Sequence, residues 1–474
     1  MTRRLELHAD RLFPADPATR EIARRLYALV RDLPILSPHG HTDPRWFATN
    51  APFANATELL LAPDHYLYRM LYSQGIALSE LGVPSRQGIA IADPRGAWKL
   101  FASNQHLFRG TPSSIWLDYV FAKVFGFDER LDAHTADRYF DVIGEKLASD
   151  AFRPRALFDR FNIEVLATTE SPVDTLEHHH AIAQLVARGG WKGRVITAYR
   201  PDVVIDPEHE AFTAALAQFA ELTREDVHSW KGYLQAHRVR RAQFALAGAT
   251  STDHGHPTAA TADLSTAEAE RLFARVIAGN VSAADAELFR AAMLVEMARM
   301  SLDDGLVMQI HPGACRNHNR WLFDHYGRDK GADVPLATEY VRALEPLLGR
   351  FGNDTRLSVI LFTLDETAYS RELAPLAGHY PALKLGPPWW FFDSFNGMVR
   401  FFDNVVETAG IYNTAGFNDD TRAYPSIPAR HDLWRRASAD WLAGLVARQL
   451  IDMEDAHEMI TALSYGLAKQ TYRL

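Results

Sequence analysis

From residue 161 onward, short apolar segments of strand length alternate with longer segments whose apolar residues recur at helical spacing. The expected strands lie at residues 33–38, 161–169, 194–200, 244–250 running into 251–254, 306–311, 357–362, 382–386 and 414–417. Alternating strands and helices indicate parallel strand pairing with the helices outside. Eight such units predict an α/β fold of the closed (β/α)8 TIM-like barrel type rather than an open sheet.

The chain has 474 residues, which is more than the roughly 250 residues typical of such a barrel. Residues 17–31 are predicted to form a helix capped by Asp16, and the first strand follows it. We expect three parts along the chain. They are residues 1–42 with the N-terminal helix and first strand, residues 43–160 as a mostly helical insertion after strand 1, and residues 161–474 as the remainder of the barrel.

Net charge, apolar runs and cysteine content limit the binding partners and the cellular compartment that we expect. The formal net charge of -9 argues against a nucleic-acid-binding surface, which normally carries a basic excess. The N-terminal residues contain no apolar run, and no stretch reaches the roughly 18 apolar residues of a membrane helix, so we expect neither a signal peptide nor a membrane span. The single cysteine, Cys315, excludes an intramolecular disulfide and is compatible with a reducing cytosol. We expect a cytoplasmic homo-oligomer.

Polar and reactive side chains follow most of the expected strands, at the point where each strand ends. They are His39, His41, Thr169, Glu170, Arg200, Asp253, His311, Asp420 and Arg422. Barrel enzymes have their active sites at the carboxyl ends of the strands, where the connecting loops meet. The positions of these side chains therefore predict one site at that end of the barrel.

His39 and His41 are separated by a single glycine at the end of the first expected strand. Residues two apart in a strand point to the same side, so both imidazoles can face one point. Barrel closure makes the first and last strands neighbours, which brings Asp420 to the same place. Two imidazoles and a carboxylate suit a single divalent ion, and zinc is the ion we expect.

Three arginines at the same end, Arg200, Arg316 and Arg422, indicate what the site binds. Guanidinium groups that converge in an acidic protein favour a small anionic substrate, and a carboxylate is the simplest such ligand. His311 ends a strand and is either a further metal ligand or a group that binds substrate oxygens. The sequence leaves both possibilities open.

Two aromatic segments allow either a functional or a structural interpretation. Tyr66, which follows His65 in the helical insertion, has a hydroxyl that could move a proton between adjacent substrate oxygens. The same segment is typical of a helix start capped by Asp64. Trp389 and Trp390 could stack on a sugar ring or simply pack at the rim of the barrel.

Taken in order, these segments resemble the uronate isomerase family, a branch of the amidohydrolase superfamily. The resemblance extends almost from end to end of the chain, through His39-Gly40-His41, Asp64-His65-Tyr66, residues 168–172, Arg200-Pro201-Asp202, Ser251-Thr252-Asp253-His254, His311 with Arg316, Trp389-Trp390 and Asp420 with Arg422. It implies reversible conversion of D-glucuronate to D-fructuronate and of D-galacturonate to D-tagaturonate.

The resemblance also implies roles for individual residues. His39, His41 and Asp420 would hold a metal that binds the C6 carboxylate and C5 hydroxyl of the sugar acid. Asp420 would act with that hydroxyl to take the C2 proton, which gives a cis-enediol. The other implied catalytic residues are His65, Tyr66 and Arg422, and the implied substrate-binding residues are Arg200, Asp253, His311, Arg316 and Trp389.

Two other functions remain compatible with the same barrel. A mononuclear metal-dependent hydrolase could use the same metal ligands. A binuclear hydrolase is disfavoured because the expected fourth strand ends in Thr252-Asp253 and supplies no lysine to bridge two metals. A barrel that binds sugar acids without turning them over is the third possibility, and it predicts an intact pocket with no exchange at C2.

Overall fold

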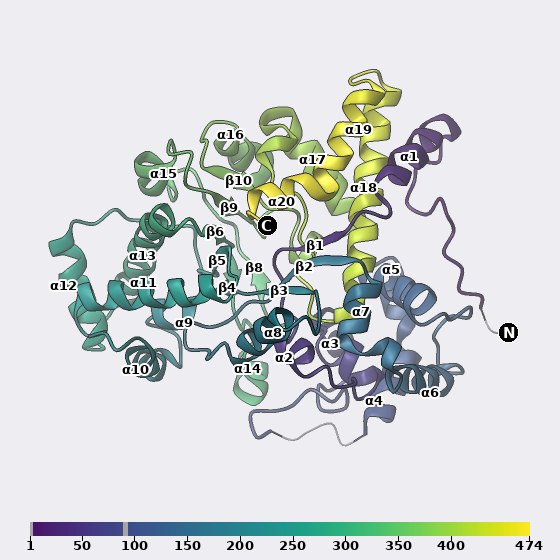
Figure 1. The fold of residues 1–474 in the computed structure, drawn as a ribbon, viewed down its shortest axis with the longest axis horizontal. Helices are drawn as coiled ribbons and strands as arrows, with labels where there is room; N and C mark the ends of the chain where they lie inside the picture. The colour runs from purple at the N-terminus through teal and green to yellow at the C-terminus, as the bar shows by residue number, and fades with distance from the viewer. Residues whose placement is uncertain (1–2, 89–92) are drawn as a thin grey trace.

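The computed structural model describes residues 3–88 and 93–474. Residues 1–2 and 89–92, which belong to the expected N-terminal part and helical insertion, lie outside the described residues. The strands are β1 (Ile35–Ser37), β2 (Ile163–Ala167), β3 (Arg194–Ile196), β4 (Ala198–Tyr199), β5 (Ser251–His254), β6 (Val307–Ile310), β7 (Ala314–Cys315), β8 (Val334–Pro335), β9 (Val359–Leu361) and β10 (Leu383–Leu385). Figure 1 shows most of them at the centre of the molecule with helices around them.

Eight of the strands pair in parallel around a barrel, in the order in which they occur in the chain, and β7 and β8 form a separate antiparallel pair. One ladder joins β1-β2-β3, a second joins β4-β5-β6-β9-β10, and a parallel bridge between Glu170 and Tyr199 links the two. At the far edge, Leu385 of β10 bridges to Thr414. The backbone N–H of His41, just after β1, donates to the carbonyl of Thr421 at 2.9 Å. This hydrogen bond joins the last segment of the barrel to the first. The chain therefore has the predicted (β/α)8 fold, and single contacts rather than a continuous ladder complete its ring.

The helices pack outside the strands. They are α1 (Pro17–Val30), α2 (Pro44–Thr49), α3 (His65–Ser73), α4 (Pro94–Ser103), α5 (Pro112–Tyr119), α6 (Ala136–Leu147), α7 (Pro154–Arg160), α8 (Glu177–Ala187), α9 (Asp202–Ile205), α10 (Phe212–Thr223), α11 (Trp230–Leu246), α12 (Thr266–Ile277), α13 (Ala283–Asp304), α14 (Arg320–Tyr326), α15 (Glu345–Phe351), α16 (Ala374–Ala377), α17 (Phe395–Ala409), α18 (Ile427–Ala447), α19 (Met453–Thr461) and α20 (Leu467–Thr471). In Figure 1, α4, α5 and α6 gather to one side of the strands, near α18.

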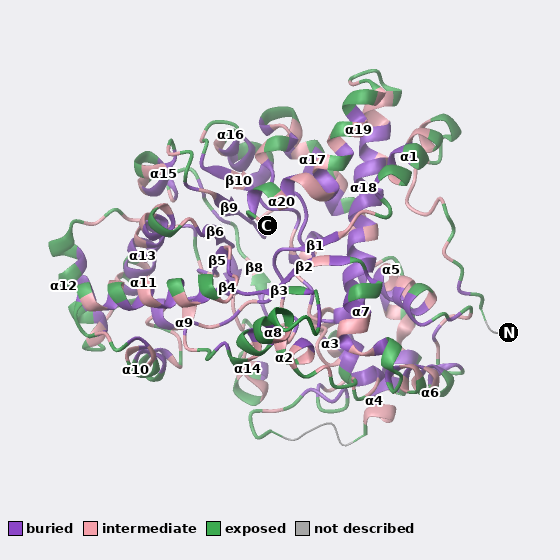
Figure 2. Cartoon of the chain, in the orientation of Figure 1, coloured by how far each residue is buried: buried purple, intermediate pink, exposed green. Residues whose placement is uncertain are grey.

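The predicted N-terminal helix is present as α1, and the Asp16 side chain accepts the backbone N–H of Thr19 at 2.8 Å. Its buried face consists of Ala23, Leu26 and Val30, and the helix packs against α18. Helix α18 is buried over most of its length, as its colour in Figure 2 shows. The division of the chain at residues 42 and 160 stays a prediction, although α2 to α7 all lie between those positions.

Two of the expected strands are misplaced. Phe244 and Leu246 belong to the end of α11, because alanines between and after them extend the helix until Gly248, at φ +98°, ends it. The strand there begins only at Ser251. Residues 414–417 form a single bridge instead of a strand. Gly416 takes φ +71° where a Cβ atom would lie 2.7 Å from the backbone nitrogen of Ala468, so α20 approaches too closely for regular strand geometry.

The C-terminal segment fills the inside of the barrel. Tyr472 is completely buried against Val307, Ile360, Phe362 and Ala415. Its hydroxyl accepts the Asn418 side-chain amide and donates to Gln309, each at 3.1 Å. This one side chain therefore holds together two strands and the segment that leads into the predicted site.

Replacing Tyr472 with alanine should lower the free energy of unfolding by about 3–5 kcal/mol, as for other buried aromatic side chains that are truncated to alanine. The change leaves a cavity inside the barrel and removes the partner of two buried amides. Denaturant unfolding followed by circular dichroism measures it. Tyr412→Ala is the matched control, because that side chain is 58% exposed and should change stability by less than about 0.5 kcal/mol. Equal losses in the two variants would contradict the interior role of Tyr472.

Candidate active site

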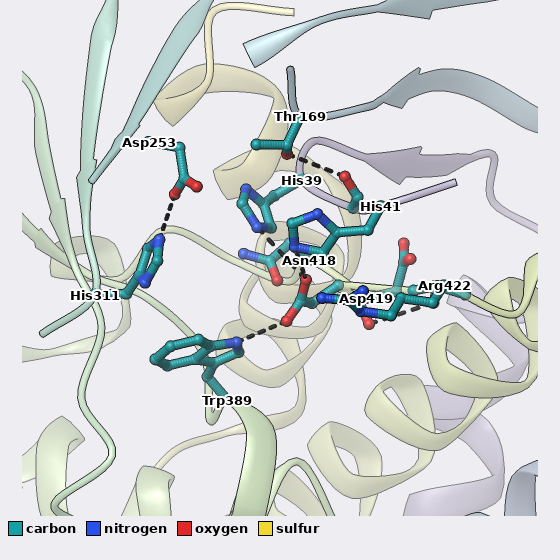
Figure 3. Close-up of polar contacts among 12 residues, drawn as sticks. His39, His41, Thr169, Asp253, His311, Trp389, Asn418, Asp419 and Arg422 are labelled. Atoms are coloured by element: carbon teal, nitrogen blue, oxygen red, sulfur yellow. Dashed lines mark hydrogen bonds and ion pairs between the residues drawn. The ribbon is translucent and has the colours of Figure 1, made fainter. Parts of the chain in front are cut away.

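The predicted site residues lie around one cavity at the carboxyl ends of the strands. Most of them line it: His39, His41, His65, Tyr66, Arg200, His311, Arg316, Trp389, Asp420 and Arg422, whereas the expected Thr169, Glu170 and Asp253 do not. Asp329, Gly331, Asp333 and Trp390 complete the lining. Figure 3 shows His39, His41, His311 and Trp389 from different parts of the barrel directed toward the same space.

His39, His41 and Asp420 form a group that could hold a metal ion, with one donor atom from each lying within 4.8 Å of the others. The Nε2 atoms of the two histidines lie 3.5 Å and 3.1 Å from Oδ1 of Asp420. That oxygen is buried and accepts no hydrogen bond, although Oδ2 accepts the indole N–H of Trp389 at 2.6 Å. Two imidazoles and a carboxylate oxygen without a donor fit a divalent cation well.

The backbone at Asp420 has an unusual conformation. Its φ of +45° lies in the left-handed region, which residues other than glycine rarely adopt. The next residue, Thr421, accepts the backbone N–H of His41 at 2.9 Å. This contact between the first strand and the last segment keeps the carboxylate opposite the two imidazoles.

Burial and neighbouring charges set the protonation of the group. Burial lowers the pKa of His41, and the nearby Asp420 does not compensate. At His39, burial is outweighed by Asp253 and Asp420, so its pKa is raised. Burial would raise the pKa of Asp420, but the adjacent imidazoles of His39 and His41 hold it well below its usual value. Asp420 is therefore ionised at neutral pH, and an ion bound here competes with a proton at His39.

The three arginines surround an acidic residue that the sequence did not single out. Burial would raise the pKa of Asp329, but Arg422, Arg316 and Arg200 outweigh it and lower the value to about 2. The carboxylate lies 4.0 Å from Arg422. Arg316 pairs with Asp333 at 2.8 Å, which leaves its guanidinium over the ring of Trp390. The cavity therefore already holds a carboxylate among its cations.

Asp253, a predicted substrate-binding residue, lies behind the lining of the cavity. Its carboxylate is completely buried and contacts Nε2 of His311 at 2.8 Å and Arg200 at 3.5 Å. Figure 3 shows the contact to His311. Asp253 thus orients two residues that do line the cavity, and its own oxygens do not face the substrate space.

His65 and Tyr66 begin α3 and reach the cavity from the insertion. Burial, together with nearby Arg422, lowers the pKa of His65 to about 3, so its ring is neutral. Burial and Asp393 raise the pKa of Tyr66, so it keeps its proton. The Tyr66 hydroxyl contacts the Trp390 carbonyl at 2.5 Å and Asp393 Oδ2 at 3.0 Å, and burial raises the pKa of that acid to about 7. Asp393 is therefore a titratable acid in direct contact with the hydroxyl of the predicted catalytic tyrosine.

Asp329, Asp333 and Asp393 carried no recognisable sequence signal. Asp329 and Asp333 lie between α14 and β8, and Asp393 follows a single turn after Trp390. None of them ends a barrel strand, so strand-end positions could not identify them. Only the folded loops bring Asp329 and Asp333 to the cavity and Asp393 to Tyr66 in its wall.

Replacing Trp389 with phenylalanine should weaken zinc binding by about 10–100-fold, the usual cost of losing a partner that orients a metal ligand. The substitution keeps the aromatic packing and removes the N–H that fixes Oδ2 of Asp420. Competition with a chromophoric chelator measures the affinity. Trp321→Phe is the control, because that tryptophan is 52% exposed on α14. Unchanged affinity in Trp389→Phe would show that the indole does not support the ligand.

Within residues 3–88 and 93–474, no helix combines the length and apolar character that a membrane crossing requires. The sequence model of the glucuronate isomerase family matches residues 17–472. A protein named uronate isomerase from Phenylobacterium zucineum is 68% identical over 474 residues, which cover 100% of this chain and 98% of that protein.

Two solved structures are similar over nearly the whole fold. The crystal structure of glucuronate isomerase from Caulobacter crescentus superimposes with a TM-score of 0.97 at 65% identity, and covers 99% of this chain and 98% of that one. The crystal structure of uronate isomerase from Thermotoga maritima has a TM-score of 0.90 at 25% identity, with 98% and 99% covered.

Proposed function

The chain belongs to the glucuronate isomerase family, and we propose that it interconverts D-glucuronate with D-fructuronate and D-galacturonate with D-tagaturonate. The observation that carries this proposal is the match to a uronate isomerase over the whole chain. The matched region includes every residue that lines the cavity. The cavity itself suits a sugar acid, because it combines a cation-binding group with three arginines. The reaction is an aldose-ketose isomerisation, so a proton must move between C2 and C1.

We assign the metal position to His39, His41 and Asp420 and propose zinc as the ion. A bound ion would supply positive charge that polarises substrate oxygens. His311 lies outside this group, and its Nε2 atom faces Asp253. We therefore place His311 among the residues that bind substrate oxygens.

The arginines account for recognition of the acid. Arg200, Arg316 and Arg422 together lower the pKa of Asp329, and a substrate carboxylate would meet the same positive field. Burial would lower the pKa of Arg200, but Asp202 and Asp253 outweigh it and keep the guanidinium charged. Trp389 packs 5.0 Å from the ring of His311 and offers an aromatic face at the same wall.

For the proton transfer, we propose that Asp420 is the base that takes the C2 proton. Its carboxylate is ionised and lines the cavity. Arg422 would stabilise the negative charge that develops on the C1 and C2 oxygens of the enediol. Tyr66 remains protonated and would donate to one of those oxygens in place of its present acceptors, the Trp390 carbonyl and Asp393, and the neutral His65 lies stacked beside it at 5.0 Å.

The direct test is an assay of the purified protein with each uronate, before and after treatment with a chelator. We expect ketose to form from both sugar acids, activity to fall after chelation, and added zinc to restore it. A mononuclear hydrolase on the same scaffold would form no ketose from either acid. Lack of ketose from the zinc-loaded protein would therefore refute the proposal.

A further inference from the structure

The sequence contains a second His-Gly-His segment, at His254-Gly255-His256, where β5 ends. The structure places Asp202, the first residue of α9, beside it, and one donor atom from each of the three residues lies within 4.8 Å of the others. The two imidazole rings are 6.1 Å apart at 90°, much as the rings of His39 and His41 are 5.2 Å apart at 88°. Two histidines and one aspartate thus form a second group of candidate ligands.

The second group faces away from the cavity of the first. Successive residues of a strand point to opposite sides. Asp253 points toward Arg200 and His311, so His254 points to the other side of β5. Gly255 lies between His311 on the active-site side and Asp202 on the other side. A Cβ atom at Gly255 would lie 2.7 Å from His311 and 2.9 Å from the Asp202 carboxylate. A group behind the active-site wall is therefore distinct from the one that lines it.

The histidine nitrogens of the second group lack partners. His254 and His256 are 0% and 4% exposed, and neither the Nδ1 atom of His254 nor either ring nitrogen of His256 makes a hydrogen bond. Nε2 of His254 lies 2.9 Å from Thr252 Oγ1, a contact that fixes the ring and leaves Nδ1 without a partner. Buried imidazole nitrogens are costly to leave without a partner, and three of them here are available to an ion.

The protonation states are those of metal ligands. Burial lowers the pKa of His254 to about 3 and also lowers the pKa of His256, so both rings are neutral. Burial would raise the pKa of Asp202, but Arg200 outweighs it, so the carboxylate is ionised. It accepts Arg200 Nε at 3.0 Å and the Gly255 N–H, and its two oxygens retain further lone pairs for an ion.

Access and local charge also favour a cation. Asp202 and Gly255 line a cavity of about 640 Å³ that includes the acidic residues Asp206 and Glu208. The nearby cation Arg290 is already paired with Asp206, Glu208 and Glu287 at 2.6–2.8 Å. Its charge is therefore neutralised locally, and five carboxylates against three arginines give the cavity beside Asp202 a net acidic lining.

We propose that Asp202, His254 and His256 bind a second divalent cation, of the zinc class that prefers imidazole and carboxylate ligands. Zinc–nitrogen bonds of about 2.0–2.1 Å require the three side chains to close in by small rotations when the ion binds. Because Asp202 also holds Arg200, the ion would fix the orientation of an arginine of the active site from behind. The proposal concerns binding and does not depend on the reaction that the cavity catalyses.

Zinc stoichiometry of the full-length protein tests this inference. The metal-free protein is dialysed against buffered free zinc, and bound metal is measured by atomic emission. We expect two ions per chain in the wild type, one in His256→Ala and one in His39→Ala. His209→Ala is the matched control, because His209 lines the same cavity outside the group, and it should retain two. One ion in the wild type, or two in His256→Ala, would overturn the proposal.

A measurement on the unmodified protein covers the case in which His256→Ala does not fold. Anomalous diffraction at the zinc absorption edge, from crystals of the zinc-loaded wild type, should show one peak at His39, His41 and Asp420 and another at Asp202, His254 and His256. Absence of the second peak would overturn the inference and would leave the first site and the proposed reaction untouched.

Discussion

Replacing Asp420 with asparagine is expected to lower kcat for uronate isomerisation by about 10²–10⁴-fold, the usual contribution of a positioned general base. Asparagine has nearly the same shape as aspartate, so the fold should stay intact. Its amide carries no charge and cannot accept the C2 proton. It also weakens the metal site, since Asp420 Oδ1 lies opposite the Nε2 atoms of both His39 and His41.

Steady-state assays with each uronate at saturating zinc measure this effect and separate loss of the base from loss of the ion. Asp303→Asn is the matched control, because Asp303 is largely exposed and pairs only with Arg238 in the described structure, at 3.3 Å. That variant should keep normal activity. Near-normal turnover in zinc-loaded Asp420→Asn would remove Asp420 from the proton transfer.

Replacing His41 with alanine should lower kcat/KM by about 10³-fold, because a metal ion contributes several kcal/mol to charge stabilisation and about 1.4 kcal/mol corresponds to a factor of ten. His41 contributes one of two imidazoles to the proposed site, and burial already keeps its ring in the neutral form that binds metal. Zinc affinity and kcat/KM should fall together.

His178→Ala provides the comparison for His41→Ala. Its side chain lies on α8 and is 34% exposed, so the same chemical change should leave both zinc affinity and kcat/KM as they are in the wild type. If His41→Ala retained full activity after exhaustive dialysis against a chelator, the ion would have no part in the reaction.

The strand ends explain why the barrel and much of the site were predictable from the sequence. A parallel barrel brings the carboxyl ends of its strands together, so most polar residues at those ends meet whatever the details of the loops, although Thr169, Glu170 and Asp253 do not line the cavity. His39, Arg200 and His311 lie at the cavity for this reason. The expected position of Asp420 beside His39 likewise follows from barrel closure, and the contact between His41 and Thr421 achieves it.

Features that depend on loops or on packing could not be predicted in this way. Asp329 and Asp393 reach the cavity or its wall from irregular segments, whose course no periodic pattern determines. Phe244 and Leu246 were expected in a strand, because a short apolar run of this kind looks the same at a helix end. Asp253 lies near the end of its strand as expected, but its side chain is buried behind His311.

Isomerisation in heavy water tests the central claim, which is proton transfer at C2 of a uronate, most directly. The zinc-loaded protein is incubated with D-glucuronate in D₂O, and the sugars are followed by nuclear magnetic resonance. The account predicts D-fructuronate, together with deuterium from solvent at the carbon that receives the transferred proton and, through the reverse reaction, at C2 of the recovered glucuronate. No ketose and no deuterium at C2 with metal present would contradict it.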